Sequence, residues 1–199
     1  MPVARGGGFG MVDRFAAAWV ALTLAFASGL AAAQESTLDA LAEPGRVLLL
    51  RHARAPGYGD PPEFRLDACD TQRNLDEVGR KQARRLGERL RAAGIDRAKL
   101  YSSQWCRCLE TARLLDLGPV EPLPALNSFF QRRRQRGERL AALRRMLAAL
   151  PQDGPPTIMV THQVTISALT GGGTPSGGGS IFALNGTGEP TLLGHTAPD

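Results

Sequence analysis

The chain contains three histidines, and two of them stand at the ends of short apolar runs. His52 follows residues 47–50 and Arg51, while His162 follows residues 157–161. Continuous apolar runs are typical of strands buried on both faces, and the carboxyl ends of parallel strands form the ligand-binding edge of an open α/β sheet. A lone histidine there would more simply fill a strand end. Two at one edge, with an arginine beside one of them, indicate a functional site.

A second arginine is expected at the same edge. Another short strand ends at residues 102–103, and Arg107 opens the helix that follows. Guanidinium groups bind phosphate oxygens in pairs, and an imidazole with one unprotonated nitrogen is a nucleophile at neutral pH. The two arginines and two histidines therefore predict phosphoryl transfer through a phosphohistidine, with no metal or other cofactor.

The rest of the chain alternates between helical and strand patterns. Asp76 is placed to cap a helix that runs to Ala93 and ends at Gly94. The longest helix is expected over residues 129–150. The remaining strand candidates are residues 98–101, 180–184 and 191–193, with a sheet edge or loop at 120–126. Alternating strands and helices predict a three-layer α/β/α fold with a mostly parallel central sheet.

Composition excludes several classes of protein. With 43% hydrophobic residues and a mean hydropathy of −0.17, the chain of 199 residues is neither disordered nor a polytopic membrane protein. The net charge of +5 includes one dense run, Arg132–Arg134 with Arg136. Aromatic stacking partners for bases are scarce, so a solvated helix face explains this run better than a polyanion site. No nucleic-acid partner is expected.

The first 33 residues have the pattern of a secretory signal peptide. Arg14 precedes an apolar stretch at residues 15–30, and the alanines at 31–33 suit cleavage near Ala33. An uncleaved anchor is the alternative, because the stretch approaches the ~20 residues that span a bilayer; its many alanines favour cleavage. We expect one domain, residues 34–199, in the periplasm or secreted, with no stable membrane span.

Three cysteines then face an oxidising compartment. Cys106 and Cys108 lie two residues apart on a predicted helix and point in different directions, so they are not expected to pair. A bridge from Cys69 to one of them is expected, which leaves one free, buried thiol. A zinc site is the alternative, but no Cys-x-x-Cys or His-x-x-x-His spacing supports it.

Four blocks in sequence order resemble motifs of the histidine phosphatase (phosphoglycerate mutase-like) superfamily. Each block alone is weak, but together they span residues 46–170 and cover most of the expected domain. The blocks are Leu50-Arg51-His52-Ala53, similar to the Arg-His-Gly signature; Leu75 to Ala83, similar to Leu-Thr-x-x-Gly-x-x-Gln-Ala; Ser102 to Ala112, similar to Ser-Ser-x-x-x-Arg-x-x-x-Thr-Ala; and Val160-Thr161-His162, similar to Val-Ser/Thr-His.

The resemblance implies the phosphoglycerate mutase-like fold and a mechanism that does not require magnesium. His52 would attack phosphorus in line and become phosphorylated. The phosphoryl oxygens would be held by Arg51, Arg107 and His162, which also stabilise the charge of the transition state. Water would then hydrolyse the phosphohistidine. A small phosphorylated substrate is the partner that this chemistry implies.

The chain departs from the family pattern at three positions. Ala53 replaces the glycine after the first histidine, and Gln163 stands where the acid-phosphatase and phytase branch carries an aspartate, which disfavours that branch. The carboxylate that protonates the leaving group in other branches is replaced near Asn127. Substitutes by position, each more simply a loop carboxylate, are Asp60, Glu63, Asp67 and Asp70. A general acid contributes about 10²–10⁴-fold, so its absence confines efficient turnover to good leaving groups.

The sequence thus predicts a phosphatase that hydrolyses a small or cell-envelope phosphomonoester, such as a sugar phosphate. Small size and the missing acid also suit a phosphohistidine phosphatase, although proteins that signal through phosphohistidine are expected in the cytoplasm. A non-catalytic module that binds phosphorylated ligands is the third possibility. Substrate specificity is expected to lie in the loop of residues 53–74 and around Phe129–Gln131.

Overall fold

The structure is a computed structural model that describes Met1 and residues 38–198. Apart from Met1, the expected signal peptide at residues 1–33 lies outside the described residues, as do the first residues of the expected domain. Residues 38–198 belong to one compact unit. No helix among the described residues is long and apolar enough to cross a membrane.

A six-stranded sheet forms the centre of the fold, with the strands in the order β3-β2-β4-β1-β5-β6. The strands are β1 (Arg46–Arg51), β2 (Lys99–Ser102), β3 (Val120–Pro122), β4 (Thr157–Thr161), β5 (Gly179–Ala183) and β6 (Thr191–Thr196). β1 pairs parallel with β4, β4 with β2 and β2 with β3, whereas β5 runs antiparallel to β1 and β6. The sheet is therefore mostly parallel, as the sequence predicts, and the short β3 is an edge strand.

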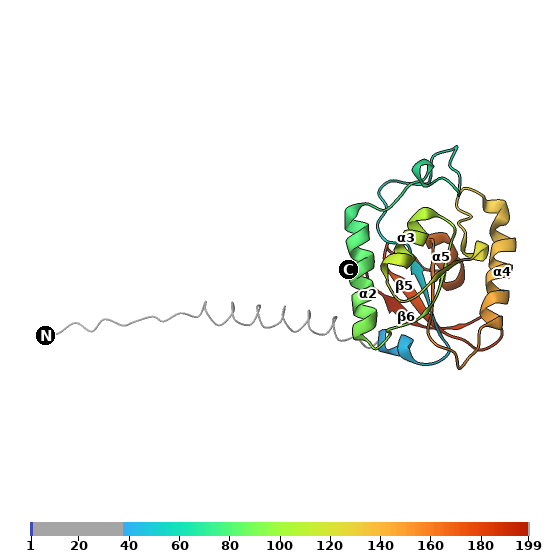
Figure 1. The fold of residues 1–199 in the computed structure, drawn as a ribbon. Coiled ribbons are helices and arrows are strands. Elements are labelled where there is room, and N and C mark those ends of the chain that lie inside the picture. Colours follow the sequence, from blue (N-terminus) through green and yellow to red (C-terminus); the bar gives the residue numbers. More distant parts are fainter. Residues whose placement is uncertain (2–37, 199) are drawn as a thin grey trace. The chain divides into compact units, whose positions relative to one another are not determined.

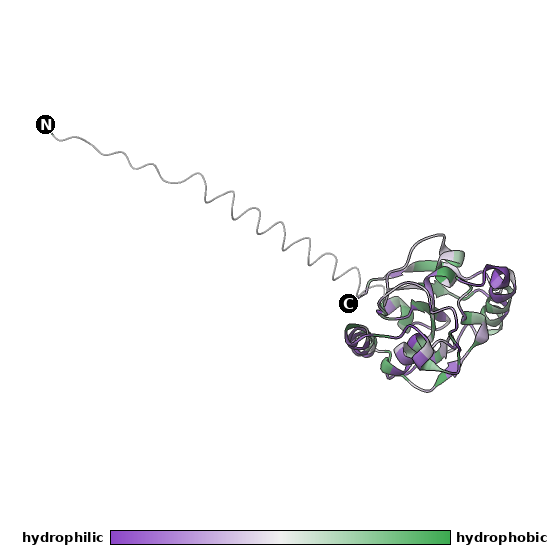
Figure 2. Cartoon of the chain, turned by 90° about the horizontal axis from the view of Figure 1, so that it is seen from above, coloured by the Kyte–Doolittle hydropathy of each residue, from purple (hydrophilic) through white to green (hydrophobic). Residues whose placement is uncertain are grey.

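Helices cover both faces of this sheet (Figure 1). The helices are α2 (Glu77–Ala92) and α3 (Cys106–Leu114) on one face, and α4 (Arg136–Ala149) and α5 (Gln163–Thr170) on the other. Alternate residues of β1 supply the two cores, because Leu48 and Leu50 pack toward α2 and α3 while Val47 and Leu49 pack toward α4 and α5. Figure 2 shows that the helices carry both hydrophilic and hydrophobic residues, as expected for elements with one buried face. The predicted three-layer α/β/α fold is confirmed.

The helix α2 begins and ends where its sequence predicts. Asp76 caps it by accepting a hydrogen bond from the Gly79 N–H at 2.8 Å, and Gly94 follows its end with a φ of +83°. Gly79 has a second role, because a Cβ there would stand 2.0 Å from the carbonyl oxygen of Arg54. A side chain at position 79 would therefore push away the loop that follows β1.

The sequence predicts one helix over residues 129–150, and this prediction is wrong about where the helix begins. Phe129–Arg132 is not helical, and a 3₁₀ turn at Arg133–Gln135 precedes α4. Phe129 is buried, and the Phe130 ring packs edge-on against Tyr58 with centroids 5.1 Å apart. These aromatic contacts hold the segment over the loop after β1 and outweigh its helix propensity.

Candidate active site

The carboxyl ends of β1 and β4 lie side by side, and a histidine follows each strand. In the parallel register Arg51 pairs with Thr161, so His52 and His162 leave neighbouring strands at the same level. The His52 N–H donates to the Thr161 carbonyl at 3.0 Å, and the two imidazole centroids are 5.5 Å apart. The structure thus brings together two histidines that are 110 residues apart in the chain.

His52 is buried, and one of its ring nitrogens is committed to the backbone. Nδ1 lies 2.8 Å from the carbonyl oxygen of Ala53, which can only accept a hydrogen bond. Nδ1 therefore carries the proton, and Nε2 keeps a free lone pair. Burial and the neighbouring guanidinium groups, Arg107 first, lower the pKa of His52 to about 3. The ring is neutral at neutral pH and has a nucleophilic nitrogen.

His162 is held by Ser103, the residue after β2, and by Cys108 of α3. Its Nε2 lies 2.9 Å from Ser103 Oγ and 3.5 Å from Cys108 Sγ. The Ser103 hydroxyl donates to Asn127 Oδ1 at 3.2 Å, so Asn127 contacts Ser103 and does not itself line the cavity described below. Burial, followed by the charge of Arg107, holds the pKa of His162 well below its usual range. Nδ1 is the ring nitrogen that these contacts leave for a ligand.

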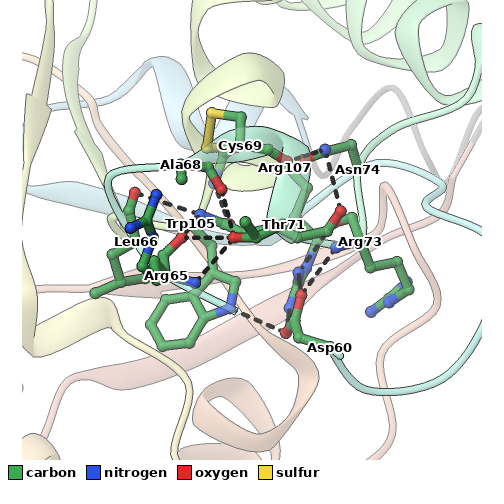
Figure 3. The surroundings of a disulfide bond; sticks show 12 residues. Asp60, Arg65, Leu66, Ala68, Cys69, Thr71, Arg73, Asn74, Trp105 and Arg107 are labelled. Carbon is green, nitrogen blue, oxygen red and sulfur yellow. Dashed lines mark hydrogen bonds and ion pairs between the residues drawn. A yellow bond between two sulfur atoms is a disulfide. The ribbon is translucent and has the colours of Figure 1, made fainter. Parts of the chain in front are cut away.

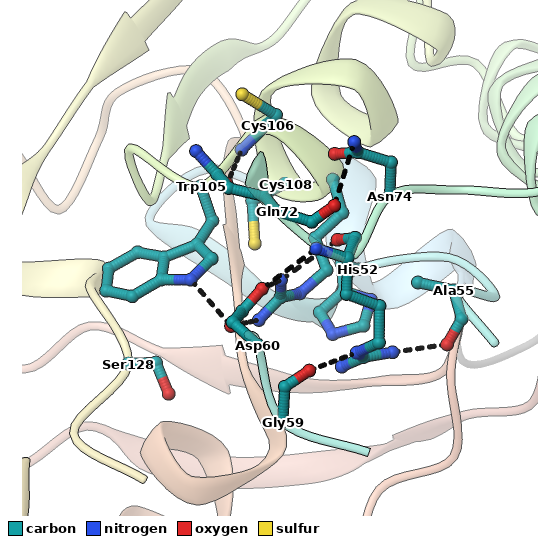
Figure 4. Close-up of polar contacts among 12 residues, drawn as sticks. His52, Ala55, Gly59, Asp60, Gln72, Asn74, Trp105, Cys106, Cys108 and Ser128 are labelled. Atoms are coloured by element: carbon teal, nitrogen blue, oxygen red, sulfur yellow. Dashed lines mark hydrogen bonds and ion pairs between the residues drawn. The ribbon is translucent and has the colours of Figure 1, made fainter. Parts of the chain in front are cut away.

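The two arginines predicted for the site have different partners. Arg51 donates from Nη1 to the carbonyl oxygen of Thr174 at 2.7 Å. Arg107 instead makes two bonds to Asp60, from Nη1 to Oδ1 at 2.7 Å and from Nη2 to Oδ2 at 3.0 Å, and both side chains are 3% exposed. Figure 4 shows the Asp60 carboxylate between Trp105 and His52. Arg107 therefore meets any phosphate as half of a buried ion pair.

Asp60 is a fixed anion in this site. Its carboxylate also accepts hydrogen bonds from Trp105 Nε1 at 3.0 Å and from the Arg73 N–H at 3.1 Å. Burial alone would raise the pKa of Asp60, but the hydrogen bonds and charge of Arg107 outweigh it and lower that pKa. The other candidate proton donors, Glu63, Asp67 and Asp70, are exposed and do not line the cavity described below. Of the four carboxylates, the structure brings only Asp60 to the site, and there it is ionised.

Arg73 is a site residue that the sequence analysis missed. It donates from Nε to the Gly59 carbonyl at 2.8 Å and from Nη1 to the Ala55 carbonyl, and it lines the same cavity as His52. Its own carbonyl accepts from Arg107 Nη1 at 3.1 Å. No family block includes position 73, and the only sequence signal was a basic residue four positions before the start of α2.

The histidines and arginines open onto a cavity of about 380 Å³ at the carboxyl edge of the sheet. Three guanidinium groups, the Asp60 carboxylate and two neutral imidazoles give its wall a net charge of +2. A phosphomonoester dianion carries the complementary charge. Gln131, Ser128 and Phe130 form part of the outer wall. Among the described residues, no three His, Cys, Asp or Glu side chains gather to hold a metal ion.

Two motif residues outside the cavity fix the backbone beside His52. Thr111 Oγ1 accepts a hydrogen bond from the Ala53 N–H at 3.0 Å, which ties α3 to the loop. Gln82 Oε1 accepts one from the Arg54 N–H at 2.9 Å, which ties α2 to the next residue of the loop. The threonine and the glutamine of the two sequence blocks therefore hold the loop after β1 against α3 and α2.

A disulfide joins the same loop to the start of α3 (Figure 3). Cys69 is bonded to Cys106, with Cα atoms 5.6 Å apart, while Cys108 is free and buried. Burial raises the pKa of the Cys108 thiol to about 12, so it stays protonated. The bridge holds the loop that carries Asp60 and Arg73 against α3.

The amino-acid sequence matches the model of one protein family. Residues 47–131 match the model of the histidine phosphatase superfamily (branch 1). The chain belongs to the histidine phosphatase superfamily. The match includes β1, α2 and α3, and therefore the histidine phosphatase blocks around His52, Gln82 and Arg107. The block with His162 lies beyond it.

Solved structures share this histidine phosphatase fold. One is a protein histidine phosphatase SixA complexed with tungstate, with a TM-score of 0.55 and 17% identity over 76% of this chain and 96% of that chain. Another is a phosphoserine phosphatase from Entamoeba histolytica in complex with 3-phosphoglyceric acid, with a TM-score of 0.50 and 15% identity over 76% of this chain and 96% of that chain. No curated protein matched the sequence.

Proposed function

We propose that this histidine phosphatase superfamily member hydrolyses phosphomonoesters through a phosphohistidine formed at Nε2 of His52. The main support is a buried, neutral imidazole whose Nδ1 is committed to the backbone, in a cavity lined by three guanidinium groups. The net charge of that cavity is complementary to a phosphate dianion, and its volume of about 380 Å³ suits a small substrate.

In the first step the lone pair of Nε2 attacks phosphorus in line with the scissile bond. The N–P bond forms as the P–O bond breaks, and the leaving oxygen keeps the electron pair. Arg51, Arg73 and Arg107 stabilise the charge on the three other oxygens. Their guanidinium groups are already held by carbonyl or carboxylate partners, so little reorganisation is needed in the transition state.

His162 is proposed to donate a hydrogen bond to one phosphoryl oxygen. The Ser103 hydroxyl has a single hydrogen, and His162 Nε2 is 2.9 Å from its oxygen. Ser103 Oγ donates this hydrogen to Asn127 Oδ1 at 3.2 Å, so the hydroxyl has to turn to the nearer Nε2 when phosphate binds, while the Gln104 N–H continues to satisfy Asn127 Oδ1. The neutral ring then carries its proton on Nδ1, the nitrogen that is free for a ligand. Ser103 is thus a positioning residue that sets the tautomer of His162.

In the second step water attacks the phosphohistidine. Its oxygen bonds to phosphorus, the N–P bond breaks, and the electron pair returns to Nε2. The proton of the water stays with inorganic phosphate or passes to solvent. The enzyme is then back in its starting state.

The leaving group has no obvious protein acid beside it. Asp60 is the only carboxylate among the described residues that line the cavity, and it is ionised. The leaving group therefore takes its proton from water, which favours esters of acidic alcohols and phenols. The same observation supports a second function, phosphohistidine hydrolysis, because a phosphoramidate leaves easily without a strong acid.

We further propose that residues 1–33 direct the protein out of the cytoplasm and are removed near Ala33. A disulfide is compatible with that location. A location outside the cytoplasm favours a phosphomonoester of the cell envelope as the substrate over a phosphorylated cytoplasmic protein. N-terminal sequencing of protein from the periplasmic fraction checks this, and an intact N-terminus on a cytoplasmic protein would contradict it.

The test of function is hydrolysis of p-nitrophenyl phosphate in the presence of EDTA. We expect turnover by the wild type, none by His52→Ala, and normal turnover by His195→Ala, the control at an exposed histidine of β6. Activity that survives His52→Ala would refute the mechanism. Comparing phosphohistidine with sugar phosphates separates the two functions, and phosphate binding without turnover or labelling of His52 would instead favour a binding module.

A further inference from the structure

A second cavity, of about 400 Å³, opens beside the catalytic one. Phe130, Arg133 and Arg136 line one side of it, and Val164, Ser167 and Ala168 of α5 line the other. We call it the arginine groove. Phe130, Val164 and Ser167 also line the catalytic cavity, so the two spaces share a wall. A molecule seated at His52 can therefore extend along this wall without leaving the protein surface.

The charges of the arginine groove differ from those of the catalytic cavity. Arg133 and Arg136 are both exposed, and among the described residues neither forms an ion pair. None of the described residues that line the groove carries a carboxylate. Two positive charges without an internal counter-ion therefore face a space that leads from the phosphoryl site.

The wall between the two sites is mainly apolar. Phe130 is half-buried and packs edge-on against Tyr58, and Val164 and Ala168 are partly buried on α5. Arg133 lies in the 3₁₀ turn before α4, and the path of residues 129–135 brings it to the groove. In the continuous helix expected over residues 129–150, the backbone before Arg133 would take a different course. The run of arginines is therefore not only a solvated helix face.

We propose that the arginine groove binds a second anionic group of the substrate. This inference rests on the proposed function and specifies its substrate class: a phosphomonoester with an apolar or aromatic body that ends in a carboxylate, sulfate or phosphate. The phosphate lies at His52, the body lies along Phe130 and Val164, and the second anion meets Arg133 and Arg136. A simple monophosphate leaves the groove empty.

The probes are two series of phenyl phosphates whose ring carries an alkyl spacer of increasing length. The spacer ends in a carboxylate in one series and in an uncharged primary amide in the other, and probes are compared in pairs with the same spacer. The measured quantity is the ratio of kcat/KM for the carboxylate to that for the amide. We expect the wild type to prefer the carboxylate by about three- to tenfold at one spacer length, because exposed ion pairs contribute little energy each. The preference should fall as salt is added.

The variant Arg133→Gln/Arg136→Gln is expected to bring this ratio to unity. Arg145→Gln is the matched control, since Arg145 is exposed on α4 but lines neither cavity, and its ratio should equal that of the wild type. A wild-type ratio near unity at every spacer length, or an unchanged ratio in the double variant, would overturn the groove. The phosphatase function would then still stand on the hydrolysis of both series.

Calorimetric binding of the same probes to His52→Ala separates the groove from turnover. A carboxylate preference in binding that is lost when Arg133 and Arg136 are also replaced supports the groove even if the wild type hydrolyses nothing. In that case the proposed function fails and the anion site remains. Equal binding of carboxylate and amide probes would reject the groove on its own.

Discussion

The cavity at His52, which we propose as the catalytic site, and the arginine groove are both lined by arginines, but they hold them differently. Arg107 is 3% exposed and fixed by two bonds to Asp60, and Arg73 is fixed by two carbonyl oxygens. Arg133 and Arg136 are exposed without carboxylate partners. Fixed charges can stabilise a transition state without moving, whereas mobile exposed charges add modest, salt-sensitive affinity. Inner replacements should therefore change catalysis, and outer ones should change substrate choice.

The largest effect is expected from Arg73→Gln. Removing one preorganised cation from the phosphoryl site should lower kcat/KM by about 10²–10³-fold, the loss typical of one oxyanion-stabilising group. Carboxylate-ended and amide-ended probes should lose the same factor, because Arg73 lines the cavity at His52 but not the arginine groove, and would meet only the phosphate that both probes share. Arg73→Lys keeps the charge and should recover part of the activity. A change in the carboxylate-to-amide ratio would contradict the division between the two regions.

Loss of the disulfide should weaken the inner region. In Cys69→Ser/Cys106→Ser, we expect the free energy of unfolding to fall by about 3 kcal/mol, because the bridge closes a long loop in the unfolded chain. Urea unfolding measures the change. A reductant should destabilise the wild type by the same amount and leave the double variant unaffected. Detection of Cys69 as a free thiol in the native protein would refute the bridge.

The variant Asp60→Asn should make Arg107 resemble the outer arginines. It leaves a buried guanidinium without its carboxylate, so the free energy of unfolding should decrease by about 3 kcal/mol. Inorganic phosphate should then bind more tightly, because it supplies the missing negative charge. Thermal unfolding with and without phosphate measures both effects, and Asp67→Asn, on the exposed part of the same loop, is the control. An unchanged phosphate affinity would contradict the idea that the Asp60 carboxylate and phosphate compete for Arg107.

The pH dependence of stability reports on His52. Its pKa is about 3 in the folded protein, below the ordinary value of 6.5, so between these values the unfolded chain binds a proton that the folded protein does not. The free energy of unfolding should therefore fall by about 1.4 kcal/mol per pH unit for this group as pH decreases from 6.5 to 3. His52→Gln should remove that part of the slope. Equal slopes in the variant and the wild type would contradict a neutral, buried imidazole.

Local patterns predicted most of the fold. The apolar runs of β1 and β4 indicated buried strands, and the Asp76 cap and Gly94 marked the ends of α2. The start of α4 was predicted wrongly, because it depends on the distant contact between Phe130 and Tyr58. A pattern within residues 129–150 contains no information about that contact.

The sequence predicted those site residues that directly follow strand ends or stand in a motif. Strand order brings His52 and His162 together, and the motif spacing places Arg107 near them. Arg73 and the Asp60–Arg107 pair depend instead on the path of the loop between β1 and α2, which has little regular structure. That loop is held by the disulfide and by side-chain bonds to backbone carbonyls, so its path could not be read from periodicity.

The most direct test of the account is to locate the phosphoryl group during turnover. Wild-type protein is mixed rapidly with an aryl phosphate and quenched in alkali, where phosphohistidine survives, and its peptides are mapped by mass spectrometry. We predict one phosphorylated residue, His52, modified at Nε2. A phosphoryl group on His162, or steady turnover with no phosphorylated residue at any time point, would contradict the account.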